Sequence, residues 1–377
     1  MKLALVIQSL ALQRGGAERF TRNLLRGLLA ERHELAVFCR EWDASAAALP
    51  MQLVRLTPGR SLRHPWYAFS RAAAVALRQH AHTELVLGLT QVCPQDVHRF
   101  GGGIYRYWFE RHYGRLFPLQ RLRPRVHYAL AFERAMYTPG NYRQLIAISE
   151  MDRRLLLEYY PVPPDRVHTI YNGFDFDEFH DRDRAAARAQ LCADHQLDPA
   201  TTLVLFAANN YVRKGLPEGI TALLRTRDPR AFSLLVIGKA HARAKAVLQQ
   251  RTAGRLTTRW LDRVDNPADY YRGADVLLFP TWYDSFANVI GEALCCGLPV
   301  ITTKQAGGAE VITPGVNGFV VSNADAYEEL TAACEALTDP VRRATFSAHA
   351  RDTVGALSIA RCTRKILHVL DLAAQGA

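Results

Sequence analysis

The sequence predicts an α/β protein with two Rossmann-like, doubly wound domains that face a central cleft. Three observations support this prediction. The chain has 377 residues, which exceeds one ordinary hydrophobic core and suits two domains. Short apolar segments alternate with amphipathic ones, as expected for parallel strands joined by helices. These segments also fall into two sets, and in such domains a ligand binds at the carboxyl ends of the strands.

The first half of the chain contains four apolar segments with the length and composition of buried strands. An amphipathic helix is predicted over Ala17–Leu29, after the first strand. The strands are Leu3–Ile7, Leu35–Phe38, Leu85–Leu87 and Leu145–Ile148.

The second half repeats this organisation. An Asn-Gly turn within Tyr171–Phe174 marks the boundary, which gives an N-terminal domain over 1–172 and a C-terminal domain over 173–357. A last helix, at about 358–377, is expected to pack back on the first domain. The predicted strands are Leu203–Phe206, Leu234–Ile237, Asp275–Phe279, Pro299–Thr302 and Gly318–Val321, and the helices are Asn288–Cys296 and Asp325–Leu337.

Composition limits the class of protein. Hydrophobic residues make up 49% and charged residues 22%, which is typical of a globular protein. No apolar run approaches the roughly 20 residues of a membrane span. The five apolar residues near the N-terminus are too few for a signal peptide, so a cytoplasmic chain is expected. Seven cysteines without a C-x-x-C pair favour neither disulfides nor zinc, and Cys295 and Cys296 are predicted to be core residues.

The charge is unusual. The net charge is +11 and the sequence pI is about 9.5. This excess of basic residues indicates a negatively charged partner. Nucleic acid, an acidic membrane surface and a phosphorylated substrate are the three candidates.

Two segments that follow predicted strands suit phosphate binding. Gly15 and Gly16 precede the first helix, where glycine allows close approach and the helix start offers free N–H groups to an anion. Arg213 and Lys214 follow Leu203–Phe206, and this pair of cations suits a diphosphate.

A third segment combines a loop and a helix start. Asp284 lies in the loop after the strand Asp275–Phe279, and Glu292 follows eight residues later within the helix. Apolar neighbours predict that the Glu292 carboxylate is near packed surface and needs a partner, for which sugar hydroxyls are suitable. The N–H groups of Phe286, Ala287 and Asn288 open the helix and can hold a phosphate.

Five ordered motifs resemble those of the retaining GT-B glycosyltransferases of family 4, and they span most of the chain. The segment Asp96–Tyr105, with the basic and aromatic residues after it, resembles the lipopolysaccharide core glucosyltransferase I type within that family. The motifs are Gly15-Gly16, Arg213-Lys214-Gly215, Asp284-x7-Glu292, Gly297-Leu-Pro-Val-Ile301 and Gly307-Gly308-Ala-Glu310.

The resemblance implies a GT-B fold and roles for individual residues. Arg213 and Lys214 would bind the donor diphosphate and stabilise the leaving nucleoside diphosphate, while Glu292 would hold the ribose. Asp284 would contact the transferred sugar, although the family usually has Glu there, which leaves the donor sugar open. Arg263 resembles a residue that contacts the base. The resemblance also implies that no metal cofactor is needed.

Asp96 and His98 follow the strand Leu85–Leu87 and are the candidates in the first half for orienting or deprotonating an acceptor hydroxyl. For each of them a purely structural role is the alternative.

The basic excess is concentrated in residues 104–134, where seven arginines stand against two glutamates. A helical wheel places aromatic residues on one face with arginines at its borders, as in helices that lie on anionic membranes. We therefore expect Arg106, Trp108, Phe109 and Arg115 to contact a membrane, with Pro118 and Pro124 ending the helix. A core-packed helix with solvated arginines is the main alternative, and nucleic-acid binding is a weaker one.

Together these observations predict an enzyme that transfers a hexose, glucose from UDP-glucose, to a lipopolysaccharide core sugar such as heptose. It would act as a peripheral protein on the inner face of the cytoplasmic membrane. The alternatives are a glycosyltransferase for another polysaccharide or glycolipid, and a nucleotide-sugar epimerase. No nucleic-acid partner is expected.

Overall fold

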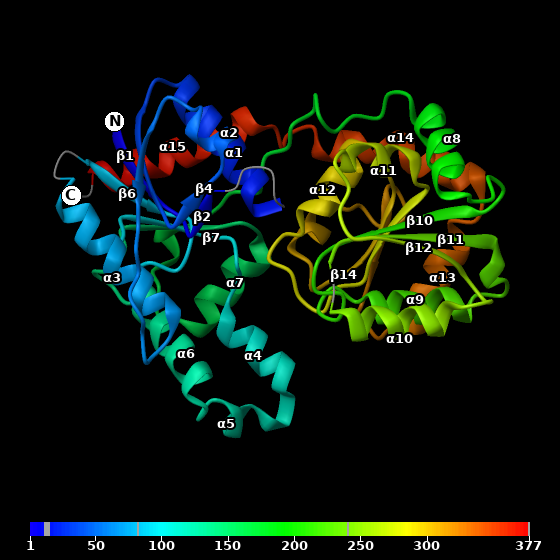
Figure 1. The fold of residues 1–377 in the computed structure, drawn as a ribbon, viewed down its shortest axis with the longest axis horizontal. Helices are drawn as coiled ribbons and strands as arrows, with labels where there is room; N and C mark the ends of the chain where they lie inside the picture. Colours follow the sequence, from blue (N-terminus) through cyan, green and yellow to red (C-terminus); the bar gives the residue numbers. More distant parts are fainter. Residues whose placement is uncertain (11–15, 81–82, 240, 376–377) are drawn as a thin grey trace. The chain divides into compact units, whose positions relative to one another are not determined.

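The computed structural model of the chain describes residues 1–10, 16–80, 83–239 and 241–375. The chain forms two compact units (Figure 1). Unit 1 comprises Met1–Gly173 and Ile359–Ala377, and unit 2 comprises Phe174–Ser358.

Unit 1 is built around a seven-stranded sheet in which every pairing is parallel. β1 lies between β3 and β6, so the connections from the middle of the sheet run in both directions. In spatial order the strands are β5 (Gln52–Arg55), β3 (Glu34–Cys39), β1 (Lys2–Val6), β6 (Leu85–Gly88), β7 (Val97–Phe100), β8 (Gln144–Ala147) and β9 (Val167–Thr169), and a small separate ladder joins β2 (Ser9–Leu10) to β4 (Glu41–Trp42).

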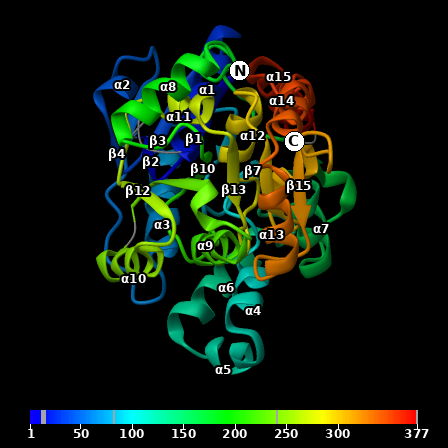
Figure 2. The same ribbon diagram turned by 90° about the vertical axis from the view of Figure 1, so that its right-hand side faces the viewer.

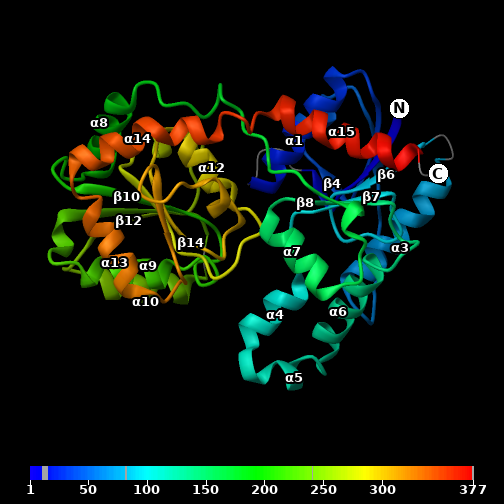
Figure 3. The same ribbon diagram turned by 180° about the vertical axis from the view of Figure 1, so that it is seen from behind.

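Alternate residues of each strand of unit 1 serve different cores. Leu3 and Leu5 of β1 pack with α1 (Gly16–Ala30) and α15 (Ile359–Gln375), which run side by side (Figure 3). Ala4 and Val6 pack on the opposite face with α3 (Pro65–Arg78). The remaining helices are α2 (Ala44–Ala47), α4 (Tyr105–Tyr113), α5 (Phe117–Gln120), α6 (Pro124–Met136) and α7 (Glu150–Tyr159), with 3₁₀ turns at Gly114–Leu116 and Pro164–Arg166.

Unit 2 has a six-stranded parallel sheet between two helical layers (Figure 2). One layer contains α9 (Leu216–Arg225), α10 (Ala242–Thr252) and α13 (Tyr327–Ala336), and the other contains α8 (Arg184–His195), α11 (Pro267–Gly273), α12 (Asn288–Cys295) and α14 (Pro340–Val354). The strand order is β12 (Thr257–Leu261), β11 (Phe232–Ile237), β10 (Thr202–Ala207), β13 (Val276–Phe279), β14 (Val300–Thr303) and β15 (Gly318–Val321), and 3₁₀ turns cover Pro229–Ala231 and Gly307–Val311.

The apolar segments of the sequence all form strands, but four further strands complete the two sheets. β5 and β12 are edge strands whose residues are largely half-buried or exposed, so their sequences lack an apolar run. β7 is fully buried although it contains His98 and Arg99, and β9 has only three residues. Cys295 and Cys296 are fully buried, which confirms their prediction as core residues.

Among the described residues, no helix combines the length and hydropathy that a membrane span requires.

Candidate functional site

The centre of the candidate site is formed by the loops that follow β10 and β13. These strands are neighbours, and the chain leaves β10 toward β11 on its other side. The sheet therefore has its topological switch point between β10 and β13, which is where open α/β sheets bind ligands.

Gly215 permits the two loops to meet. Its φ of +77° lies in the left-handed region, and a Cβ atom at this position would lie only 1.8 Å from the carbonyl oxygen of Pro280. The Arg213 carbonyl accepts hydrogen bonds from the Trp282 N–H at 3.0 Å and from the Thr281 hydroxyl at 3.1 Å. The basic loop is thus fixed against the loop that carries Asp284.

Lys214, which is buried, and Asp284, which is half-buried, form an ion pair across these loops. Burial lowers the pKa of Lys214, and the carboxylate of Asp284 opposes that shift. Burial alone would raise the pKa of Asp284, but Lys214, Arg213 and hydrogen bonds outweigh it, so the pKa of this carboxyl is below its ordinary value. The pair therefore holds a cation at the carboxyl edge, and the ammonium carries three N–H donors.

Asp284 also caps the start of α12. Its Oδ1 accepts the N–H of Ala287 at 2.9 Å and the N–H of Phe286 at 3.2 Å. These are two of the groups expected to hold a donor phosphate together with Asn288. The N–H groups of both Phe286 and Ala287 are thus already bonded to an internal carboxylate, which corrects the expectation for these two residues. Gly307 and Gly308 donate to the carbonyls of Asp284 and Phe286, at 2.8 and 2.6 Å.

Glu292 lies on α12 and is only 4% exposed. The hydroxyl of Tyr271, on α11, donates to its Oε2 at 2.9 Å. The prediction that this carboxylate is near packed surface and needs a partner is confirmed. Sequence reasoning missed Tyr271 itself, because α11 precedes Glu292 by about twenty residues and no motif marks the contact.

The remaining residues predicted to contact the donor are Arg263, Gly15 and Gly16. Arg263 is exposed in the loop after β12. Gly16 is the first residue of α1 in unit 1, whereas Gly15 lies outside the described residues. In the described parts of the chain, no group of three or more His, Cys, Asp or Glu side chains is arranged to hold a metal ion.

Asp96 has a structural position rather than the expected acceptor contact. It precedes β7 at the amino end of that strand, where its Oδ2 accepts the N–H of Val86 at 2.8 Å. Its Oδ1 pairs with Arg143 at 2.9 Å, and Arg143 also donates to the Ala373 carbonyl. Since ligands of such sheets lie at the carboxyl ends, Asp96 is at the opposite edge.

His98 is likewise a core residue. It lies within β7, is 1% exposed and packs near the rings of Phe100 and Tyr137. Burial lowers the pKa of His98 to about 3, so the imidazole is neutral. The expectation that it orients an acceptor is corrected by this burial.

The basic segment of residues 104–134 forms an arm of unit 1 rather than one helix. α4 ends at Gly114, whose φ is +50°, while Pro118 lies in the first turn of α5 and Pro124 begins α6. The prediction that the prolines end the helix is therefore wrong, because the glycine ends it first.

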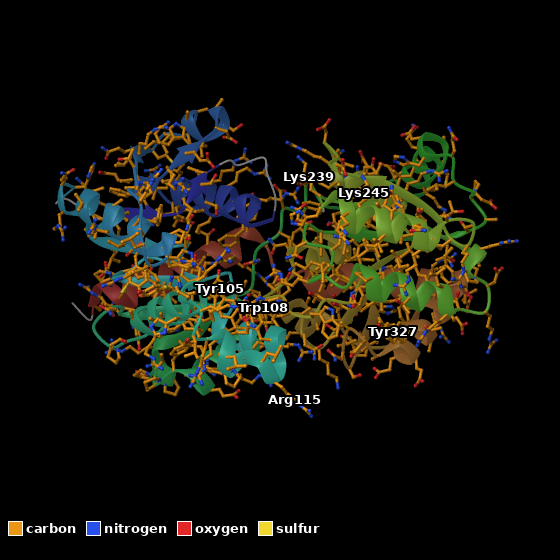
Figure 4. All side chains as sticks on the ribbon, turned by 60° about the horizontal axis from the view of Figure 1, so that its bottom comes forward. Tyr105, Trp108, Arg115, Lys239, Lys245 and Tyr327 are labelled. Atoms are coloured by element: carbon orange, nitrogen blue, oxygen red, sulfur yellow. The ribbon has the colours of Figure 1, made fainter. Side chains whose placement is uncertain are left out.

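Part of the aromatic face of α4 packs against protein. Phe109 and Tyr105 are half-buried and pack against the cluster of Trp66, Ala129 and Phe132, so the expected membrane contact of Phe109 stays a prediction. Arg106 pairs with Glu110 at 3.0 Å, and Trp108 is half-buried and stacks on His112. Arg115 is exposed and projects from the arm (Figure 4).

The exposed apolar groups of the arm are three leucines, of which the helical wheel places only Leu116 on the aromatic face. Leu116, Leu119 and Leu122 are 58%, 67% and 70% exposed. We call these three residues the leucine tip. In the sequence these leucines recur every third residue among arginines, and this pattern could have predicted an exposed apolar surface.

Comparison with known families supports the same enzyme class in both units. The family model described as Glycosyltransferase Family 4 matches residues 14–178, and the model described as Glycosyl transferases group 1 matches residues 201–339. A probable transglycosylase of Burkholderia thailandensis is 28% identical over 376 residues, covering 96% of this chain and 94% of that protein. The lipopolysaccharide glucosyltransferase WaaG of Escherichia coli is 22% identical over 344 residues, covering 89% and 90%.

Solved structures agree on the fold. The crystal structure of WaaG matches with a TM-score of 0.85 at 20% identity, covering 97% of this chain and 99% of that chain. Anabaena HepE in complex with UDP-glucose matches with a TM-score of 0.74 at 17% identity, covering 98% and 99%. Each unit is an α/β domain with a parallel sheet, and the two family models match successive parts of the chain. The chain is therefore a nucleotide-sugar-dependent glycosyltransferase of family 4, and it has the GT-B fold of these structures.

Proposed function

We propose that the enzyme transfers glucose from UDP-glucose to a lipopolysaccharide core sugar, heptose being the expected acceptor, with retention of configuration and without a metal ion. The observation that carries the donor side is the Lys214–Asp284 pair at the switch point of unit 2, with Glu292 on the next helix. The likeness to WaaG, a lipopolysaccharide glucosyltransferase, supports the acceptor class.

The residues suggest how transfer would proceed. The bond between the sugar C1 and the diphosphate oxygen breaks, and negative charge develops on the departing UDP. Arg213 and Lys214 would stabilise that charge because they are held in place before the reaction. The acceptor hydroxyl bonds to C1 and passes its proton to an oxygen of the departing diphosphate, and Glu292 would hold the ribose hydroxyls.

Nucleoside diphosphate release tests the proposal. The purified chain is mixed with UDP-glucose, UDP-galactose or GDP-mannose, with and without heptose-terminated core glycolipid, in buffer containing EDTA. Release of UDP from UDP-glucose only when glycolipid is added is the expected result. Release with a different acceptor supports the alternative glycosyltransferase, and sugar isomerisation without release would contradict transfer altogether. Loss of activity in EDTA that added Mg²⁺ restores would contradict metal independence.

Membrane attachment is the second part of the proposal. The leucine tip and the exposed Arg115 are suited to a leaflet of anionic lipid, where leucines enter the apolar region and arginines meet headgroups. A lipid-linked acceptor would then be presented at the inner face of the cytoplasmic membrane.

Vesicle co-sedimentation tests this attachment. We expect stronger binding to vesicles that contain phosphatidylglycerol than to neutral ones, and a marked loss of binding in the triple variant Leu116→Ser, Leu119→Ser, Leu122→Ser. Leu62→Ser is the control, because Leu62 is an exposed leucine of unit 1 that lies outside the arm. Equal binding of the triple variant and the wild type would overturn the role of the leucine tip.

A further inference from the structure

Arg99 is a buried guanidinium that pairs with no carboxylate among the side chains that the structure describes. It lies in β7 and is 6% exposed, and its Nε has no hydrogen-bond partner among the described residues. Among the described residues, the titratable group that interacts with it is the thiol of Cys362, whose pKa burial raises, and no Asp or Glu does so. Burying a cation without a counter-ion is unfavourable, so this arrangement calls for an explanation.

The surroundings of Arg99 stabilise the cation only in part. The ring of Phe20 covers its guanidinium at 3.5 Å, and Asn172 accepts a hydrogen bond from one terminal nitrogen. Burial lowers the pKa of Arg99 to about 10, which leaves the side chain charged at neutral pH. A neutral amide could hold Asn172 equally well, so an anchoring role alone does not account for a charged group here.

The other terminal nitrogen lies just beneath an exposed glycine. A Cβ atom on Gly101 would be 3.2 Å from the Arg99 Nη1. Gly101 follows the last residue of β7, so this nitrogen is close to the carboxyl edge of the sheet in unit 1. β7 is next to β6, and β6 forms the switch point of this sheet with β1. The missing side chain at Gly101 leaves room for a ligand to approach.

We propose that Arg99 binds an oxyanion carried by the acceptor, either a phosphate monoester or a carboxylate on the acceptor saccharide. The inference rests on the proposed function in one respect, namely that unit 1 binds a saccharide acceptor. The guanidinium fork suits both oxyanions, because two N–H groups can meet two oxygens. The ligand would supply the negative charge that the described surroundings of Arg99 lack.

The first test uses inorganic phosphate and acetate as probes in thermal unfolding of the full chain, with saturating UDP to occupy the proposed donor site and sodium chloride at matched ionic strength. We expect both probes to raise the Tm of the wild type in a concentration-dependent manner, because a ligand that binds the native state stabilises it. Arg99→Gln should remove this response, and Arg99→Lys should keep part of it. A wild type that responds to neither probe, or an Arg99→Gln variant that responds as the wild type does, overturns the proposal.

A second variant avoids the risk that loss of Arg99 damages the fold. Gly101→Asp places a carboxylate beside the guanidinium, so it should raise the Tm without phosphate and abolish the phosphate response. Gly102→Asp is the matched control, since a Cβ there would lie near Gln91 and Tyr105, at 3.5 Å, instead of Arg99. Equal phosphate responses in the two glycine variants would contradict the site.

An activity measurement separates the two sources of the oxyanion. Core glycolipid acceptor is compared before and after treatment with alkaline phosphatase, which removes phosphate monoesters and leaves carboxylates. In Gly101→Asp the KM for the anionic acceptor should rise by roughly tenfold or more with little change in kcat. A rise that disappears after dephosphorylation identifies phosphate, and one that persists identifies carboxylate. If no donor releases UDP, the proposed function fails, while the phosphate probes still decide whether Arg99 binds oxyanions.

Discussion

At the scale of the residue, the length of Asp284 determines its contacts. A short carboxylate can accept N–H groups two and three residues ahead, as Asp284 does from Phe286 and Ala287. The same side chain also reaches Lys214. A glutamate, which the family usually has, would extend past this capping position. Asp284 therefore joins the basic loop to α12 and fixes the cation that is expected to meet the donor diphosphate.

Removal of that cation should impair both chemistry and stability. Lys214→Met takes away a charge aimed at the leaving group, which should slow transfer by about 2–4 kcal/mol in the barrier, or roughly 30- to 1,000-fold. It also leaves the half-buried carboxylate of Asp284 without its ion-pair partner, so the Tm should fall. UDP-release kinetics and thermal unfolding measure the two effects. Lys365→Met, which removes an exposed charge on α15, is the control, and transfer at the wild-type rate in Lys214→Met would refute the assignment.

Substitution of Glu292 should weaken the binding of UDP more than it slows the transfer of the sugar. Glu292→Gln keeps the shape of the side chain but lacks the charged acceptor that a ribose would use. We expect UDP affinity to fall by roughly tenfold, corresponding to one charge-assisted hydrogen bond. Isothermal titration with UDP measures this change. Glu310→Gln, on the 3₁₀ turn Gly307–Val311, serves as a comparison within unit 2, and an unchanged Kd in Glu292→Gln would count against the ribose role.

At the scale of the element, a buried carboxylate holds α4 in place. The residue before α4, Ile104, supplies no side-chain cap, and Glu133 of α6 accepts the N–H groups of Tyr105 and Arg106 at 2.6 and 3.0 Å. The Tyr160 hydroxyl donates to the same carboxylate at 2.6 Å. Burial raises the pKa of Glu133 to about 7 against these hydrogen bonds. The position of the arm thus depends on one titratable group.

This shift gives a pH dependence with a definite sign. Because the pKa of Glu133 is higher in the folded state than its ordinary value of 4.5, the native state binds more protons, and stability falls as pH rises from 4.5 through 7. The change is at most about 3 kcal/mol. Urea unfolding at pH 5 and pH 8 should show a more negative change in stability with rising pH in the wild type than in Glu133→Gln, because the opposite contribution of His98 is common to both proteins. Glu110→Gln is the control on α4 itself, and equal pH slopes in all three proteins would exclude the effect.

The elements also show what the sequence could predict. Strands with apolar runs, such as β10 and β13, were predictable because both faces of a parallel sheet are buried. β7 was not, because Val97–Phe100 contains two ionisable side chains that are buried only through tertiary contacts. The helical wheel drawn for residues 104–134 predicted an amphipathic helix, but it could not show which face of α4 packs against the rest of unit 1. Likewise the site loops followed from strand ends, whereas the pairing of Lys214 with Asp284, 70 residues apart, depends on how the loops fold.

At the scale of the whole molecule, the chain forms two compact units, and two buried groups with oppositely shifted pKa values lie in unit 1. Buried His98 and Glu133 both belong to unit 1. Their effects oppose each other, because burial lowers the pKa of His98 to about 3 while it raises that of Glu133. The stability linked to His98 is complete above its ordinary pKa of 6.5 and is lost as pH falls toward 3. Acid should therefore open unit 1 through His98.

Hydrogen exchange read by mass spectrometry can follow each unit separately as pH is lowered, because cooperative regions exchange as units. His98→Gln keeps a neutral polar side chain that does not take up a proton, so unit 1 should retain its protection at a lower pH than in the wild type. Exchange in unit 2 should be unaffected by this change. His349→Gln, on the exposed surface of α14, is the matched control and should leave both units as in the wild type. If His98→Gln and the wild type lose protection in unit 1 at the same pH, acid sensitivity originates elsewhere. If both units shift together, they unfold as one cooperative body.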